Sequence, residues 1–282
     1  MQLVTFSRRD EPGGSFLGAL EGEEVADLSS LGLDMRAVAR GGADVLTRLR
    51  ETAQVAERVP LTEVRLQAPI QPGKVLCSGV NYKGHADENP NAKMPEEPFF
   101  FAKLPSSISG PEDPIQKPAR LQQLDYEVEF AAVIGRRLYR AEESEVMPAI
   151  FGYTLLNDVS ARDVQFKDNQ ITLGKNFSGF APIGPCILTS DELSDPNDVR
   201  LRTRLNGRTL QDGNTSDWLF PLPRLIAFLS EVMPLEPGDI VTTGTPAGVG
   251  IFQKPPVFMW PGDVVEIEAD GIGVLRNPVV EI

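Results

Sequence analysis

The sequence predicts an α+β protein, in which a β-rich domain of mixed sheets with few helices follows a small N-terminal α/β domain. Three observations support this prediction. Short apolar runs separated by turn residues fill the chain from residue 74 onward, 25 glycines and 24 prolines suit many tight connections, and few segments show helical periodicity. Strands and helices do not alternate regularly, which argues against repeated βαβ units.

The small leading domain is predicted over residues 1–70. Short strands separated by glycine turns are expected within 1–35. Residues 36–58 carry an amphipathic helical pattern, in which Gly41-Gly42 predicts a break. A strand and a linker rich in proline and glycine follow, so we place the domain boundary near residue 70.

The larger domain, residues 71–282, consists mainly of expected strands. Its apolar runs include KVLCSGV, VEFAAVIG, FGYTLL, IGPCILT, DIVTTG and DVVEIEA. Helices are expected at 141–150, at 221–233 between flanking prolines, and as a short third helix at 161–168.

Composition argues against several classes of function. The chain has 27 basic and 40 acidic residues, and a net charge of −13 disfavours a nucleic-acid partner. No run of 18 uncharged apolar residues exists, so no membrane span is expected. The N-terminus lacks the apolar core of a signal peptide and only two cysteines are present, which together predict a cytoplasmic location.

Common catalytic motifs are also absent. The sequence contains no P-loop, no G-x-G-x-x-G after a strand, no C-x-x-C and no G-x-S-x-G, and its single histidine excludes H-E-x-x-H. These absences argue against most nucleotide-dependent chemistry, dithiol chemistry and the commonest layout of serine hydrolases.

Two glutamates in the segment DYEVEFAAVIG, residues 125–135, are the strongest functional signal. On a strand, Glu127 and Glu129 share one face about 6–7 Å apart, and the apolar continuation of both faces predicts an interior strand. Two buried carboxylates repel each other, and a hard divalent cation such as Mg²⁺, Mn²⁺ or Ca²⁺ removes that repulsion. A solvated pair of acids is the alternative. Asp158, after the apolar run 151–156, is either a third ligand or a helix N-cap.

The single histidine, His85, lies three residues before Glu88. On a helical turn the two side chains meet, and the carboxylate then orients the imidazole and raises its basicity, as a general base requires. The alternative is an exposed histidine in a mobile loop. Residues 86–98 are polar and rich in proline, which favours a flexible lid.

Seven motifs resemble those of the fumarylacetoacetate hydrolase family, in the same order and with similar spacing. They are G-V-N-Y-x-x-H-x-x-E, P-F-F-F-x-K, D-Y-E-V-E, G-Y-T-x-x-N-D-V-S-A-R-D-x-Q, G-K-x-F, P-I-G-P and T-G-T-P-A-G-V-G. No single motif is specific, but the ordered set is. The resemblance covers residues 74–282, and the leading domain is similar to that of many bacterial members.

The resemblance implies a role for each matching residue. It implies that the metal ligands are Glu127, Glu129 and Asp158. It implies that the catalytic residues are His85 and Glu88, which activate water from the lid, and Lys175, which faces the developing enolate oxygen. It implies that the substrate-binding residues are Lys103, near the outer shell of the metal, and Arg162, Gln165 and Thr245.

The implied activity is Mg²⁺-dependent hydrolysis of a C–C bond in a small 2,4-dioxo acid, such as an acylpyruvate or a diketo-deoxy sugar acid, through a metal-stabilised enolate. The same enolate also serves an isomerase, decarboxylase or dehydratase of a 2-oxo acid, for example a 2-hydroxyhepta-2,4-diene-1,7-dioate isomerase or an oxaloacetate decarboxylase. A ligand-binding protein without activity is a further alternative. Relatives are usually dimers, so a homodimer is expected.

Overall fold

Strands dominate the computed structural model, which describes residues 1–88, 94–167 and 170–282. The leading segment contains β1 (Gln2–Arg8), β2 (Glu11–Glu21), β3 (Glu24–Asp27), β4 (Arg58–Pro60) and β5 (Val64–Leu66). The rest of the chain contributes β6 (Val75–Ser78), β7 (Phe100–Lys103), β8 (Ile108–Ser109), β9 (Ile115–Lys117), β10 (Leu124–Asp125), β11 (Val128–Ile134), β12 (Ile150–Asn157), β13 (Ser160–Ala161), β14 (Ala181–Thr189), β15 (Arg200–Leu205), β16 (Arg208–Asn214), β17 (Ile240–Thr242), β18 (Val264–Ala269) and β19 (Gly273–Glu281).

The α-helices are short and few, as the sequence predicts. They are α1 (Met35–Arg40), α2 (Gly42–Val55), α3 (Lys83–Glu88), α4 (Glu143–Val146), α5 (Arg162–Gln165), α6 (Thr172–Lys175) and α7 (Leu222–Val232). Within the described ranges, no helix combines the length and the apolar character needed to cross a bilayer. The β-rich α+β architecture is therefore confirmed.

One large mixed sheet runs through both parts of the chain. Its strand order is β4-β3-β2-β1-β14-β12-β11-β17-β6-β7, with β5 paired to β1 and β8 paired to β14. The leading strands join it through β1, whose Gln2 and Leu3 pair with Leu188 and Ile187 of β14. The sheet thus continues across residue 70, and the domain boundary there stays a prediction.

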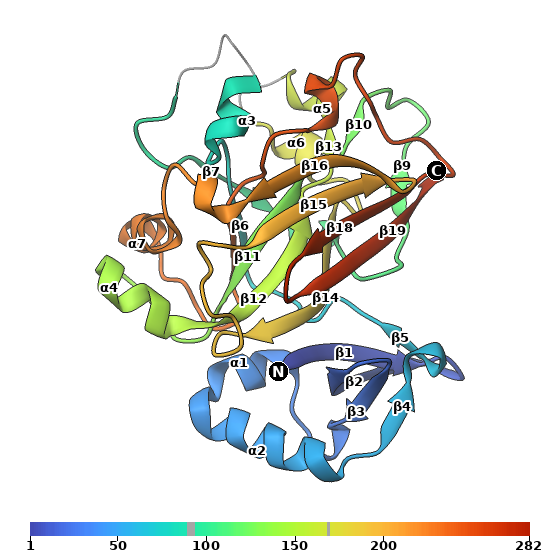
Figure 1. Cartoon of the computed structure of the whole chain (residues 1–282), viewed down its shortest axis with the longest axis vertical. Helices are drawn as coiled ribbons and strands as arrows, with labels where there is room; N and C mark the ends of the chain where they lie inside the picture. The colour runs from blue at the N-terminus through green and yellow to red at the C-terminus, as the bar shows by residue number, and fades with distance from the viewer. Residues whose placement is uncertain (89–93, 168–169) are drawn as a thin grey trace.

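A second sheet, in the order β16-β15-β18-β19-β9, packs across the first. In Figure 1, α3, α5 and α6 gather at the end of the molecule opposite the leading segment. A two-stranded sheet of β10 and β13 lies beside α5 and α6 at that same end. The polar motifs noted in the sequence therefore collect away from the leading segment.

Strand β11 occupies the middle of the large sheet, and every one of its residues is buried. The alternation of its side chains divides them between two hydrophobic cores: Val128, Phe130, Ala132 and Ile134 belong to one, and Ala131 and Val133 to the other. The expectation of an interior strand covered on both faces is confirmed, so any charged group at its start is held in buried surroundings.

The predicted helices form where helix signals begin and end them. The break at Gly41 separates α1 from α2, and Gly42 adopts a φ of 62°, which a glycine tolerates without strain. Helix α7 starts after Pro221 and buries Leu222, Leu225, Ile226 and Leu229 along one face. The expected third helix is shorter than predicted, since α5 ends at Gln165, and residues 168–169 lie outside the described ranges.

Candidate active site

The three acidic residues proposed as metal ligands lie together where β11 begins and β12 ends. The strands run antiparallel with Val128 opposite Asn157, so Glu127 and Asp158 flank the same end of the pair. The Asp158 amide donates a hydrogen bond to the Glu127 carbonyl oxygen at 2.9 Å. One carboxylate oxygen from each of Glu127, Glu129 and Asp158 lies within 4.8 Å of the others.

The surroundings of Glu129 indicate whether this cluster is suited to bind a cation. It is 1% exposed, its Oε2 atom has no hydrogen-bond partner, and among the described residues no basic side chain forms an ion pair with it. Burial raises its pKa well above the usual value, and the neighbouring carboxylates of Asp158 and Glu127 raise it further. A divalent cation bound by oxygen ligands removes this penalty, so the donor set fits such an ion.

Two lysines compensate the other acids of the cluster. The Lys175 amino group lies 2.9 Å from Oε2 of Glu127 and 2.5 Å from Oδ2 of Asp158. Burial alone would lower the pKa of Lys175, but the Asp158 and Glu127 carboxylates raise it, so the side chain stays cationic. The lysine predicted to face the substrate oxygen therefore also contacts two of the proposed ligands.

Lys103 lies behind the cluster and is completely enclosed. Its amino group approaches Oδ1 of Asp158 at 2.6 Å and donates to the carbonyl oxygens of Val159, Lys175 and Phe180 at 3.0, 2.6 and 2.7 Å. Burial lowers its pKa, which the Asp158 charge opposes. These partners use its donors, so the geometry favours a role in positioning Asp158 over the predicted contact with substrate.

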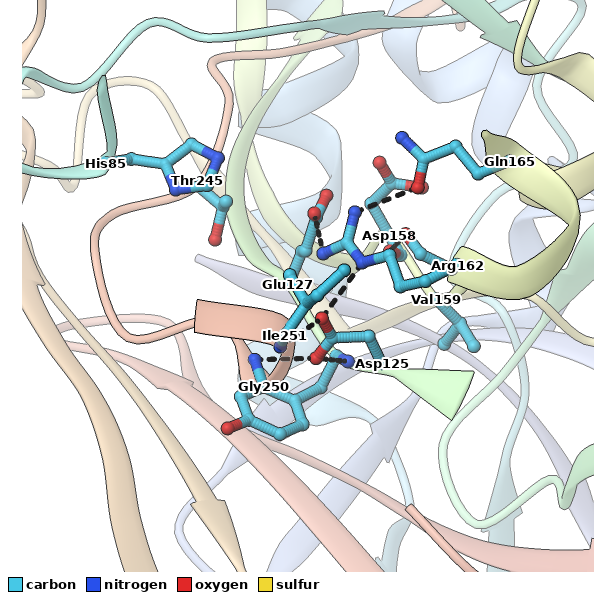
Figure 2. Close-up of polar contacts among 12 residues, drawn as sticks. His85, Asp125, Glu127, Asp158, Val159, Arg162, Gln165, Thr245, Gly250 and Ile251 are labelled. Atoms are coloured by element: carbon cyan, nitrogen blue, oxygen red, sulfur yellow. Dashed lines mark hydrogen bonds and ion pairs between the residues drawn. The ribbon is translucent and has the colours of Figure 1, made fainter. Parts of the chain in front are cut away.

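Arg162 bridges two acids at the start of α5, as Figure 2 shows. Its Nε donates to Oδ2 of Asp125 at 2.9 Å, one terminal nitrogen donates to Oε1 of Glu127 at 2.5 Å, and the other donates to Oε1 of Gln165 at 2.9 Å. Burial alone would raise the pKa of Glu127, but the charges of Arg162 and Lys175 outweigh it and lower that pKa. Glu127 is thus held as an anion by the folded chain.

His85 and Glu88 meet on α3, as their spacing predicts. His85 Nδ1 lies 2.7 Å from Oε2 of Glu88, whose Oε1 accepts a hydrogen bond from the amide of Gly248 at 2.7 Å. A carboxylate accepts at this position, so the neutral ring carries its proton on Nδ1 and has its lone pair on Nε2. The predicted lid extends into residues 89–93, which lie outside the described ranges.

A cavity of about 150 Å³ connects these groups. Seven of the ten predicted site residues line it: His85, Glu127, Glu129, Arg162, Gln165, Lys175 and Thr245. Glu88, Lys103 and Asp158 support these residues from behind. Figure 2 shows six of the ten, which come from segments widely separated in the chain: His85, Glu127, Asp158, Arg162, Gln165 and Thr245. The cavity therefore combines an imidazole, cationic side chains and a cluster of carboxylates.

Two buried residues with important contacts were assigned no role from the sequence. Asp125 accepts hydrogen bonds from the amides of Gly250 and Ile251 at 2.7 and 3.0 Å, and pairs with Arg162. A signal for it exists, because Asp125 precedes Glu127 by two residues and continues the alternation of acids. Gln211 contacts Thr245, and its isolated position in a polar strand offers no comparable signal.

Comparison with characterised proteins gives the same family as the motifs. The family model described as fumarylacetoacetate (FAA) hydrolase, C-terminal, matches residues 74–280. The mitochondrial oxaloacetate tautomerase of Xenopus laevis is 41% identical over 289 residues, which cover 99% of this chain and 90% of that protein.

Two solved structures share the fold over the whole chain. The 5-carboxymethyl-2-hydroxymuconate delta-isomerase of Mycobacterium smegmatis superposes with a TM-score of 0.81 at 37% identity and covers 100% of both chains. Maleylpyruvate hydrolase of Sphingobium sp. SYK-6, in complex with manganese(II) and pyruvate, superposes with a TM-score of 0.84 at 32% identity and covers 100% of this chain and 99% of that one. Motifs, fold and relatives agree, and the chain belongs to the fumarylacetoacetate hydrolase family of enzymes.

Proposed function

We propose that this enzyme interconverts the enol and keto forms of a small 2-oxo dicarboxylic acid, with oxaloacetate as the model substrate. The observation that carries the proposal is the single cavity shared by His85, Lys175 and the carboxylate cluster. Its volume of about 150 Å³ suits a substrate of few carbon atoms. The 41% sequence identity to an oxaloacetate tautomerase over 99% of this chain supports the same reaction.

We assign the cation to Glu127, Glu129 and Asp158. When bound, a divalent cation polarises the 2-oxo group as a Lewis acid and offsets negative charge on its oxygen. A cluster of carboxylate oxygens suits Mg²⁺, and the manganese(II) in the Sphingobium hydrolase is compatible with a similar donor set.

His85 transfers the proton in this proposal. In the keto-to-enol direction, Nε2 takes a proton from the carbon next to the 2-oxo group. The electron pair of that C–H bond forms the C=C bond of the enol, and the π pair of the C=O bond moves onto the carbonyl oxygen. The imidazolium then gives the proton to this oxygen, and the reverse direction follows the same path. Glu88 holds the ring and stabilises its charged form, while Lys175 and Arg162 offset the negative charge of the reacting acid.

Hydrolysis of a C–C bond, the activity implied by the sequence motifs, is the second candidate. The His85–Glu88 pair that accepts a proton from carbon can also accept one from water. The hydroxide then adds to the distal carbonyl of a 2,4-dioxo acid, the C–C bond breaks, and the imidazolium protonates the released enolate carbon. The full-length similarity to maleylpyruvate hydrolase favours keeping this reaction as a candidate.

Comparing two substrates on one preparation separates the candidates. Enzyme loaded with Mg²⁺ or Mn²⁺ is mixed with the enol form of oxaloacetate, and the loss of enol absorbance is followed. The same enzyme is then tested for release of pyruvate from an acylpyruvate. Accelerated ketonisation without acylpyruvate cleavage supports the tautomerase, and efficient cleavage with no effect on ketonisation supports the hydrolase. Activity on neither substrate contradicts both proposals.

We also propose that the enzyme works as a homodimer in the cytoplasm, as the family resemblance and the low cysteine content suggest. Light scattering coupled to size-exclusion chromatography measures the assembly, and a mass corresponding to one chain of 30.8 kDa would contradict the dimer. Fractionation of the source cells tests the location.

A further inference from the structure

Gln211 is a buried glutamine of β16 whose amide group is fully used by four neighbours. It is 0% exposed. Its Oε1 accepts from the amide of Val128 at 3.1 Å and from the hydroxyl of Thr203 at 2.7 Å. Its Nε2 donates to Oγ1 of Thr245 and to the carbonyl oxygen of Pro246, both at 2.8 Å. The side chain therefore connects the strand of the carboxylate cluster to the segment that carries Thr245.

Two of these neighbours determine which way the amide of Gln211 faces. The backbone N–H of Val128 can only donate, so it must meet the amide oxygen. The carbonyl oxygen of Pro246 can only accept, so it must meet the amide nitrogen. Rotating the amide by 180° would break both contacts inside the core, where an unpaired polar group costs free energy. Gln211 consequently acts as a donor toward Thr245.

This orientation controls the hydroxyl group of Thr245. Because Oγ1 already accepts from Gln211, the proton of the hydroxyl must point elsewhere. Within residues 1–88, 94–167 and 170–282, no group accepts a hydrogen bond from Thr245, and its side chain lines the cavity that contains His85 and Lys175. The hydroxyl is thus a donor available to a molecule bound in that cavity.

We propose that Gln211 is a positioning residue of the substrate site, which fixes the Thr245 hydroxyl as a hydrogen-bond donor to a carboxylate of the bound 2-oxo acid. Gln211 lies behind Thr245 and is not among the cavity-lining residues, so it acts through Thr245. The inference rests on the proposed function, because it requires an anionic substrate at Thr245.

The substitution Gln211→Glu tests this proposal with little change in size. The introduced carboxylate can still accept from Val128 and Thr203, but its second oxygen would accept the proton of Thr245 and turn it away from the cavity. Oxalate binding to the Mn²⁺-loaded enzyme, measured by calorimetry, should weaken about 10- to 100-fold, as for loss of a hydrogen bond to a charged group. KM for oxaloacetate should rise similarly while kcat changes little, because the bond is made equally in the ground and transition states.

Gln253→Glu is the matched control. Gln253 is partly buried and donates to the carbonyl oxygens of Gly248 at 2.9 Å and Leu210 at 3.4 Å, and among the described residues it forms no hydrogen bond with Thr245. Replacing it with glutamate makes the same chemical change. Oxalate affinity should stay within about twofold of wild type, because Gln253 has no hydrogen-bond partner in common with Gln211. Gln211→Met is the second variant, should the buried carboxylate prevent folding; it also removes the donor to Thr245.

A double substitution decides the route of the effect. The Gln211 substitution is combined with Thr245→Val. If Gln211 acts only through Thr245, this double variant should bind oxalate no more weakly than the single Thr245→Val variant. The same expectation holds for Gln211→Met where that variant is used. An equal loss in both backgrounds, or an unchanged affinity in the single Gln211 variant, would overturn the proposal while leaving the proposed function intact. Wild-type enzyme that neither binds oxalate nor acts on oxaloacetate would instead overturn the proposed function and this inference together.

Discussion

Replacing Glu127 or Glu129 with glutamine should separate two tasks that the carboxylate cluster combines. Both substitutions remove an expected cation ligand. Only Glu127 also forms ion pairs, with Arg162 and Lys175, whereas Glu129 has no basic partner among the described residues. The two variants should therefore have similar defects in metal binding and different stabilities without metal.

The magnitude follows from these contacts. Glu127→Gln leaves buried Arg162 and Lys175 each without one anionic partner, which typically costs about 3–5 kcal/mol. For a chain of 282 residues this corresponds to a decrease in Tm of about 5–9 °C. In Glu129→Gln, a neutral amide replaces an acid whose pKa is raised by burial, so the Tm of the metal-free protein should change by less than about 2 °C.

Calorimetric unfolding in excess EDTA, followed by titration of the folded variants with Mn²⁺, measures both properties. Mn²⁺ affinity should fall by more than about 100-fold in both variants, beyond the range typical of residues that only support a ligand. Glu266→Gln is a control, since the Arg276–Glu266 pair is partly exposed and contributes about 0–1 kcal/mol. Equal destabilisation by Glu127→Gln and Glu129→Gln would refute the division of tasks, and wild-type Mn²⁺ affinity in either variant would refute that residue as a ligand.

Further predictions concern His85, the enclosed Lys103 and Gly250, whose amide donates to Asp125. His85→Asn should lower kcat about 10²- to 10⁴-fold without changing Mn²⁺ affinity. Stopped-flow kinetics measures the turnover and calorimetry the Mn²⁺ affinity. Unaltered turnover would exclude His85 as the base. Lys103→Met removes a buried partner of Asp158 and should destabilise the fold by about 3–5 kcal/mol in urea titrations, so a loss below about 1 kcal/mol would contradict its positioning role. Gly250→Ala should cost about 1–3 kcal/mol, because its methyl group would collide with the carbonyl oxygen of Val257, and a neutral result would show that this loop can shift. Chelation of the metal by EDTA should abolish turnover and added Mn²⁺ should restore it, whereas full activity in EDTA after exhaustive dialysis would contradict metal dependence.

Local sequence patterns were sufficient to predict the acids at 127 and 129 and the His85–Glu88 contact, whereas the family resemblance supplied the remaining site residues. The period-2 alternation of residues 127–134 indicated both an interior strand and two acids on one face, and three-residue spacing brought His85 and Glu88 together. The pattern of prolines and apolar residues likewise located α7. These predictions succeeded because each depends on residues within about two helical turns or one strand.

Partner choice inside the site could not be predicted in the same way. The sequence suggested a substrate contact for Lys103, but the fold surrounds its amino group with Asp158 and three carbonyl oxygens. It assigned no role to Asp125 or Gln211, whose contacts lie 37 and 34 residues away in the chain at Arg162 and Thr245. Such contacts depend on how strands and loops are brought together, and no local periodicity encodes them.

The family, the β-rich architecture and the kinds of side chain available for chemistry can all be inferred from the linear chain, because ordered motifs and local periodicity are properties of that chain. The pairing of acids with basic side chains became visible in the folded chain alone, where Glu129 has no basic partner among the described residues. Strand register accounts for this surrounding: Glu129 pairs opposite Leu156 in β12, and a slip of one residue would turn its side chain to the other face of the sheet.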